Sequence, residues 1–384
     1  MIANAKEQVF LRCPVANCPR KTELRIQEGE NFLPQNPMLF SPVAAQTAAV
    51  LSMSAEDQSL LTQNLKNLGY TDILILHSTG GDRIGMTIAS RLFGEELQIA
   101  VVFQGTSGDE WYSNFEIGYT AEHSGFSKAA DYAELRLGDY VFTHAIGREP
   151  SFFLTGYSRG GAVANILAKR LCDRYGLEQV CAYTFASPAT TISRRTNRYG
   201  TIFNLTRSED FFTRVPLRSW GYTHYGKTVS LSDHGDMTAR YRAVTGEDYI
   251  GFTRRTAVDH FLLAIQRLAP NVHAYYERRR KVGDQRLSLY ELMRAVADML
   301  SEHPDEETAD VFFAAVISDY ADLISFLSSG ADLTEMLSSS LGVPKCSVAD
   351  SHCPAAYLAA LDVFLEDQPA ELADSRRSGA AETV

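Results

Sequence analysis

The stretch SFFLTGYSRGGAVANILAKRL, residues 151–171, decides the fold. Mostly apolar residues run into Gly156-Tyr157-Ser158-Arg159-Gly160, and a segment rich in small residues follows at once. The pattern predicts a buried strand, a tight turn and a helix, with Ser158 at the apex of the turn. The alternative is a serine without a chemical role in a glycine-rich connection.

Two glycines favour the first interpretation. A turn this tight holds its apex residue in strained backbone geometry, so a side chain two positions before or after it would clash with the strand or the helix. Gly156 and Gly160 occupy these two positions. The hydroxyl of Ser158 would then project above the sheet, at a helix N-terminus whose N–H groups favour an oxyanion. We therefore interpret Ser158 as a nucleophile.

Short apolar runs recur on both sides of this stretch, and they do not alternate with polar residues. Such runs indicate strands buried on both faces, as in a parallel sheet covered by helices. The predicted strands are 72–77, 98–103, 152–154, 179–185 and 201–205. Helical spacing is found over 46–68, 128–146 and 161–175. The alternation predicts an α/β fold with a mostly parallel central sheet.

The chain divides into four expected regions. Residues 1–45 are punctuated by proline and are expected to be irregular, and 46–282 form the predicted α/β domain. Helical patterns at 287–300, 306–327 and 355–365 predict a helical C-terminal appendage over 283–366. Residues 367–384 are charged and small, and are expected to fray.

The composition limits the possible partners. The formal net charge of −11 argues against a general role in nucleic-acid binding. The first residues lack the apolar segment of a signal peptide, and no later segment approaches 18 apolar residues. We expect a cytoplasmic protein, with release by another route left open. Six cysteines are present. Two clusters, Cys13 with Cys18 and Cys346 with Cys353, could staple the two ends of the chain together by disulfides or by a metal, and the alternative is free thiols.

A serine needs a base and an orienting carboxylate to act as a nucleophile. Glu209 and Asp210 follow the predicted strand 201–205, where such a carboxylate belongs, and the residues alone do not decide between them. Nine histidines are candidates for the base. His260 falls in a helical pattern, His273 lies just past it, and His352 falls in the expected appendage.

Five segments, in this order, make residues 45–280 resemble the class 3 lipase family of the α/β-hydrolase fold. The segments are VVFQGTSGDEWYSNF, AEHSGFSKAA, LTGYSRGGAVANILA, TFASPAT and SEDFFTRVPLRSWGYTHYGKTVSL. The chain departs from the family at Gln104, where arginine is usual, and at Tyr157, where histidine is common. Residues 111–115 fall where the family carries a lid or an acyl-binding flap, and core packing is an equal alternative.

The resemblance implies a role for each site residue. Ser158 would be the nucleophile and Asp210 the orienting acid. His273, followed by two tyrosines as in the family, is favoured as the base, and His260 is the second choice. Backbone amides of Thr106 and Arg159 would form the oxyanion hole.

The resemblance thus implies a serine hydrolase of carboxylic esters that works through an acyl-enzyme, with no cofactor and no metal. The expected partner is a lipid or small-molecule ester, with at most peripheral contact with lipid surfaces. A thioesterase or amidase with the same triad is an alternative, and so is a catalytically silent fold used for binding.

Overall fold

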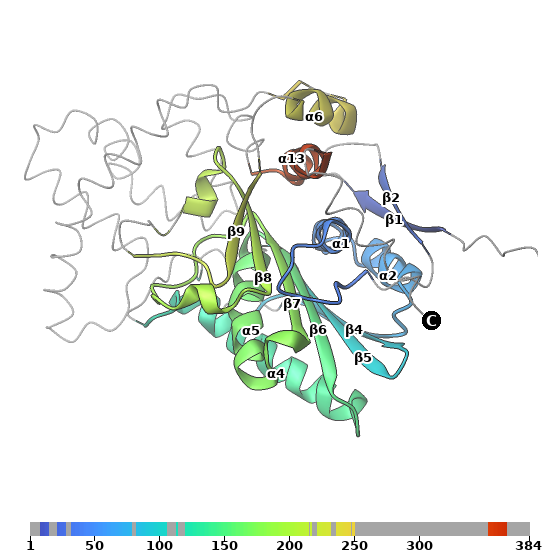
Figure 1. Cartoon of the computed structure of the whole chain (residues 1–384), viewed down its shortest axis with the longest axis vertical. Helices are drawn as coiled ribbons and strands as arrows, with labels where there is room; N and C mark the ends of the chain where they lie inside the picture. The colour runs from blue at the N-terminus through green and yellow to red at the C-terminus, as the bar shows by residue number, and fades with distance from the viewer. Residues whose placement is uncertain are drawn as a thin grey trace, which may run out of the picture.

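A seven-stranded sheet forms the centre of the molecule in the computed structural model (Figure 1). The residues that the structure describes are 8–14, 21–27, 32–78, 82–105, 113, 120–214, 216, 221–231, 236–246, 248–249 and 352–366. The strands follow one another in chain order across the sheet, from β3 to β9. They are β3 (Asp72–Leu76), β4 (Met86–Phe93), β5 (Glu96–Phe103), β6 (Pro150–Tyr157), β7 (Val180–Phe185), β8 (Ile202–Arg207) and β9 (Lys227–Leu231).

The predicted mostly parallel sheet is confirmed. Strands β5 to β9 pair in parallel, and β3, β4 and β5 pair antiparallel. All five predicted strands are present, whereas β4 and β9 were not predicted. Polar residues interrupt the apolar run of β4, among them the buried Arg91, whose guanidinium bonds the Gln98 side chain across the hairpin. Strand β9 lies at the edge of the sheet, and most of its residues are at least partly exposed.

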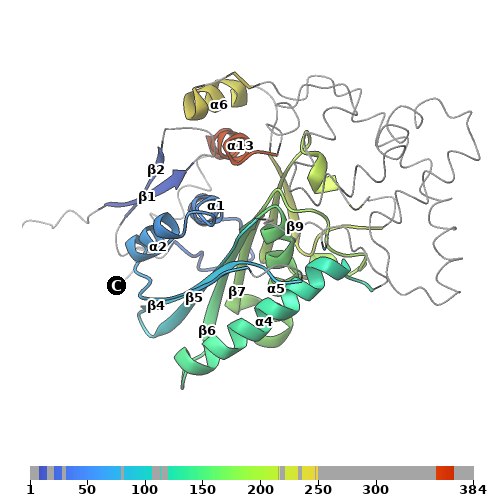
Figure 2. The same ribbon diagram turned by 180° about the vertical axis from the view of Figure 1, so that it is seen from behind.

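Helices cover both faces of the sheet (Figures 1 and 2). One face packs against α4 (Ser124–His144) and α5 (Arg159–Tyr175), which lie side by side. The other face is covered by α1 (Pro42–Met53), α2 (Gln58–Asn67) and α13 (Pro354–Glu366). Helix α6 (Met237–Thr245) packs against α13. Three short 3-10 helices lie in the connections, at Leu177–Gln179, Thr196–Arg198 and Phe211–Arg214.

The N-terminal region differs from the expected irregular segment. It contains an antiparallel hairpin of β1 (Gln8–Pro14) and β2 (Lys21–Gln27). The side chain of Asn64 on α2 holds β1, because it accepts the N–H of Arg12 at 2.9 Å and donates to the carbonyl of Arg12 at 2.7 Å. The hairpin is therefore attached to the α/β domain through a buried amide.

Helix α13 is part of the core of the α/β domain, although we expected an appendage over 283–366. Its residues Ala356, Leu358 and Leu361 are buried in the same apolar cluster as α1. The helix is apolar on almost every side, which is typical of a core helix rather than of a surface one. The other helical patterns of that region, at 287–300 and 306–327, lie outside the described residues, as does 367–384.

None of the described helices is long and apolar enough to cross a bilayer. Cys172, Cys181 and Cys353 carry thiols rather than disulfides, and burial raises the pKa of Cys172 to about 11. Cys18 and Cys346, which the staple hypothesis requires, lie outside the described residues.

Substitution of Leu361 by alanine tests whether α13 belongs to the core. Leu361 is 1% exposed, so truncation leaves a cavity, and we expect the free energy of unfolding to fall by about 2–5 kcal/mol. Leu135, which is 65% exposed on α4, is the matched control, and its replacement by alanine should change stability by less than about 0.5 kcal/mol. Equal effects in denaturant titrations would show that α13 does not stabilise the domain.

Candidate active site

The turn between β6 and α5 has the strained geometry that its sequence predicts. Ser158 has φ 54° and ψ −124°, a conformation that residues with a side chain rarely adopt. A Cβ atom on Gly156 would lie 2.3 Å from the carbonyl carbon of Gly160, and one on Gly160 would lie 2.4 Å from the carbonyl oxygen of Gln104. Both glycines are therefore required by the close approach of strand, turn and helix.

The hydroxyl of Ser158 projects toward an imidazole. Ser158 precedes α5, but its side chain does not cap the helix. Its Oγ lies 3.0 Å from Nε2 of His352 instead. The backbone N–H of Ser158 donates to the carbonyl of Phe185 at the end of β7, and this bond holds the turn against the neighbouring strand.

Asp210 lies in the loop after β8, at the edge of the sheet where parallel strands end. Its side chain is 0% exposed and accepts hydrogen bonds from three donors. Nδ1 of His352 lies 2.9 Å from Oδ2, the Tyr357 hydroxyl donates to Oδ2 at 2.6 Å, and the N–H of Phe212 donates to Oδ1 at 3.0 Å. A buried carboxylate is stabilised by such donors, which offset part of its cost of desolvation.

His352 occupies the position that we expected for His273. Its two ring nitrogens connect Asp210 to Ser158, and its ring packs against Phe212 with the centroids 4.4 Å apart. His273 and the second choice, His260, lie outside the described residues. His352 was not favoured as the base from the sequence, because residues 283–366 were expected to form an appendage.

Two signals in the sequence could have identified His352. It is followed by Tyr357 five residues later, which fits the family pattern of histidine and tyrosine as well as His273 does. The apolar helix that begins at Pro354 was a second signal, because a helix apolar on nearly all sides is expected inside the domain.

Of the two candidate carboxylates, only Asp210 contacts the imidazole among the described residues. Glu209 accepts a hydrogen bond from the Tyr249 hydroxyl at 2.8 Å and lies 3.7 Å from the guanidinium of Arg207. The Arg207 side chain is fully buried, and it also donates to the Tyr249 hydroxyl at 2.6 Å. Glu209 thus balances a buried cation, which leaves the orientation of His352 to Asp210.

The tyrosines beside Asp210 remain protonated. Burial raises the pKa of Tyr357 well above its usual value, and the negative charge of Asp210 raises it further. Burial also raises the pKa of Tyr157 well above its usual value, and the negative charge of Asp210 raises it further. Both phenols are therefore protonated hydrogen-bond donors near neutral pH.

Residues 100–220 match the family described as Lipase (class 3). This match contains the strand before the oxyanion segment, the turn at Ser158 and the loop with Asp210. Over these residues the chain resembles the class 3 lipases. It is an ester hydrolase with an α/β-hydrolase fold, as the resemblance implied.

Solved fungal lipases are similar to this chain at low identity. A lipase–propeptide complex of Rhizomucor miehei, in a deletion mutant, is 19% identical with a TM-score of 0.41, over 50% of this chain and 67% of that chain. A lipase of Rhizopus microsporus var. chinensis is 20% identical with a TM-score of 0.36, over 51% of this chain and 73% of that chain. No curated protein matches the chain.

The strand that leads to the expected oxyanion segment is held by the turn between α1 and α2. Gln104, at the position where the family usually has arginine, donates from Nε2 to the carbonyl of Ala55 at 2.9 Å. The N–H of Gly105 donates to Oε1 of Glu56 at 2.9 Å. Thr106 lies outside the described residues, as do Trp111 and Phe115 of the expected lid segment.

Arg159, the other expected oxyanion residue, begins helix α5 directly after Ser158. Its backbone therefore lies at the positive end of the helix dipole. The Arg159 side chain is buried, with its guanidinium 5.9 Å from the centroid of the Phe126 ring and one nitrogen 3.4 Å from the carbonyl of Arg83.

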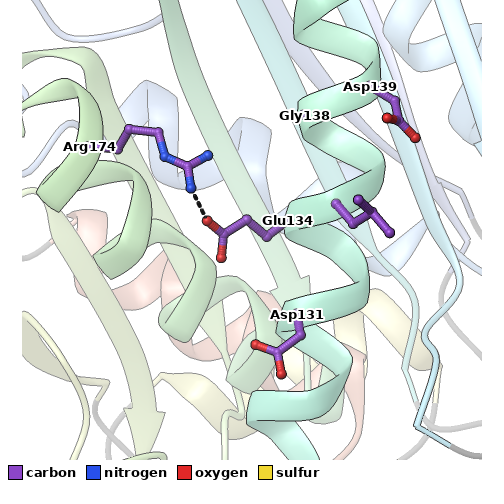
Figure 3. A pocket seen from close by; sticks show the side chains of 6 residues that line it. Asp131, Glu134, Gly138, Asp139 and Arg174 are labelled. Atoms are coloured by element: carbon purple, nitrogen blue, oxygen red, sulfur yellow. Dashed lines mark hydrogen bonds and ion pairs between the residues drawn. The ribbon is translucent and has the colours of Figure 1, made fainter.

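A hollow lies between α4 and α5 (Figure 3). It is lined by Asp131, Glu134, Leu135, Gly138, Asp139 and Arg174. Arg174 is in the last turn of α5 and is paired with Glu134 at 2.5 Å, whereas Ser158 precedes the first turn. Because 17 helical residues span about 25 Å, this hollow is not where an ester would reach Ser158.

Substitution of Gly156 by alanine tests the tight turn. The added methyl group would meet the backbone of Gly160, so we expect the free energy of unfolding to fall by about 3 kcal/mol or more. Gly138→Ala is the matched control, because nothing lies within 4 Å of its Cβ position in α4. That variant should gain about 0.5–1 kcal/mol in denaturant titrations. A Gly156→Ala variant as stable as wild type would contradict this geometry.

Proposed function

We propose that Ser158, His352 and Asp210 form the catalytic triad of this ester hydrolase. The observation that carries the proposal is the continuous chain of hydrogen bonds from the buried Asp210 through His352 to the Ser158 hydroxyl. A serine with a histidine in reach and a carboxylate behind it is the arrangement that activates a serine hydroxyl.

The proposed reaction proceeds in two stages. Nε2 of His352 removes the hydroxyl proton as Ser158 Oγ attacks the ester carbonyl, and the tetrahedral oxyanion is stabilised by the backbone amides of Arg159 and Thr106. The protonated His352 then gives its proton to the leaving alcohol, and an acyl-enzyme remains. Water, activated by His352, attacks this acyl group and releases the acid and the free serine.

Asp210 orients the imidazole in this proposal. Its carboxylate accepts the Nδ1–H of His352, so the lone pair of the neutral imidazole is directed at Ser158. The same carboxylate stabilises the imidazolium that forms during attack. The bonds from Tyr357 and Phe212 keep the Asp210 carboxylate in place.

We propose acyl esters of glycerol or of phospholipids as the substrate class. The family assignment of residues 100–220 supports this proposal. The net charge of −11 opposes strong adsorption to anionic lipid, so contact with a lipid surface would be peripheral.

Labelling with a fluorescent fluorophosphonate tests the triad. Ser158→Ala and His352→Ala should each lower kcat on a chromogenic ester by about 10⁴-fold or more and abolish labelling, because the nucleophile or its base is missing. His273→Ala and His260→Ala should label at the wild-type rate. His144→Ala, on the far end of α4, is the control for a change of histidine to alanine. Normal labelling of His352→Ala, or its loss in His273→Ala, would refute the assignment of the base.

Hydrolysis of p-nitrophenyl esters from acetate to palmitate tests the substrate class. A lipase should prefer the longer chains and should show a rise in rate above the solubility limit of the ester. Monoacyl and diacyl phosphatidylcholine, with release of fatty acid as the readout, test for a phospholipase. A preference for acetate with no response to aggregated substrate would contradict a lipid substrate.

A further inference from the structure

Tyr157 links the nucleophile turn to the segment that carries the base. It is the last residue of β6, directly before Ser158, and its hydroxyl donates to the backbone carbonyl oxygen of His352. The two residues are 195 positions apart in the sequence. One short contact therefore ties the backbone that presents the nucleophile to the backbone that presents the base.

The carbonyl of His352 lies outside the hydrogen bonding of helix α13. The amides of Ala356 and Tyr357 both donate to the carbonyl of Cys353, one residue later, and Pro354 has no N–H. Among the described residues, the donor that reaches the His352 carbonyl is the Tyr157 hydroxyl. An unsatisfied carbonyl in this apolar setting would favour another backbone conformation.

The Tyr157 ring also contacts the catalytic groups. It packs against the imidazole of His352 with the centroids 5.6 Å apart, and edge-on against Tyr357 at 5.7 Å. Tyr157 is almost fully buried, so its phenol has little water to bond instead. Burial raises the pKa of this phenol well above its usual value, which keeps the donor proton in place.

We propose that Tyr157 is a positioning residue that sets the distance between Nε2 of His352 and Oγ of Ser158. The proposal rests on the triad proposed above. Asp210 fixes the rotation of the imidazole through Nδ1, and Tyr157 fixes the backbone from which the imidazole extends. These contacts of Tyr157 are made with His352 and Tyr357, so their loss should impair proton transfer and leave binding of the ester unchanged.

Tyr157→Phe removes the hydroxyl and keeps the ring, so it tests the hydrogen bond alone. We expect kcat on a short chromogenic ester to fall by about 10-fold or more, with KM within about two-fold, because small misplacements of a base are costly. The rate of fluorophosphonate labelling should fall in parallel. Active sites are counted by labelling each variant to completion, and kcat is expressed per labelled site. All rates are measured well below the melting temperature of the variant, so that unfolded molecules do not lower the apparent kcat.

Tyr140→Phe is the matched control. Tyr140 is also buried, and its hydroxyl also donates to a backbone carbonyl, that of Asp72 at 2.6 Å, but on α4 and away from the site. Its removal should change kcat and the labelling rate by less than about two-fold.

The outcomes separate the two proposals. If wild-type Ser158 is labelled and Tyr157→Phe has the kcat of Tyr140→Phe, the positioning role is refuted and the triad stands. An increase in KM with unchanged kcat would also refute it, because it would indicate a role in binding. If folded wild type is neither labelled nor active, the proposed function itself fails.

Discussion

The buried carboxylate of Asp210 is the interaction on which the rest of the site depends. A carboxylate with no exposure is costly unless donors surround it, and here one comes from its own loop and two come from the C-terminal segment. His352 and Tyr357 must therefore both lie beside the end of β8 to donate hydrogen bonds to this carboxylate. The same contacts join helix α13 to the site, so the position of this helix and the geometry of the site depend on each other.

A second constraint is the strained backbone conformation at the ends of two adjacent strands. Ser158 after β6 and Ala186 after β7 both have positive φ, at 54° and 52°. The strain at each is sustained by bonds across the sheet, because Ser158 N–H donates to Phe185 and Ala186 N–H donates to Leu205. Strands β6, β7 and β8 thus hold one another in the arrangement that exposes the Ser158 hydroxyl.

The elements that were predicted correctly are those with a strong local pattern. The apolar runs of β5 to β8 and the helices between them could be read from short windows of sequence. Strand β4 could not, because the buried Arg91 needs partners such as Gln98 on β5 and the carbonyl of Leu68, to which it donates at 2.5 Å. Such a burial depends on partners that a local window does not contain.

The sequence by itself determined the tight turn at the proposed nucleophile, because five consecutive residues contain both glycines that the turn needs. It also limited the proposed acid to two residues at the end of a strand. The proposed base could be located only in the tertiary structure. His352 lies 142 residues from Asp210 and 194 from Ser158, and no spacing in the chain links them. They are brought together by the burial of α13 and by the hydrogen bonds that the buried Asp210 carboxylate needs. Both exist only in the folded molecule.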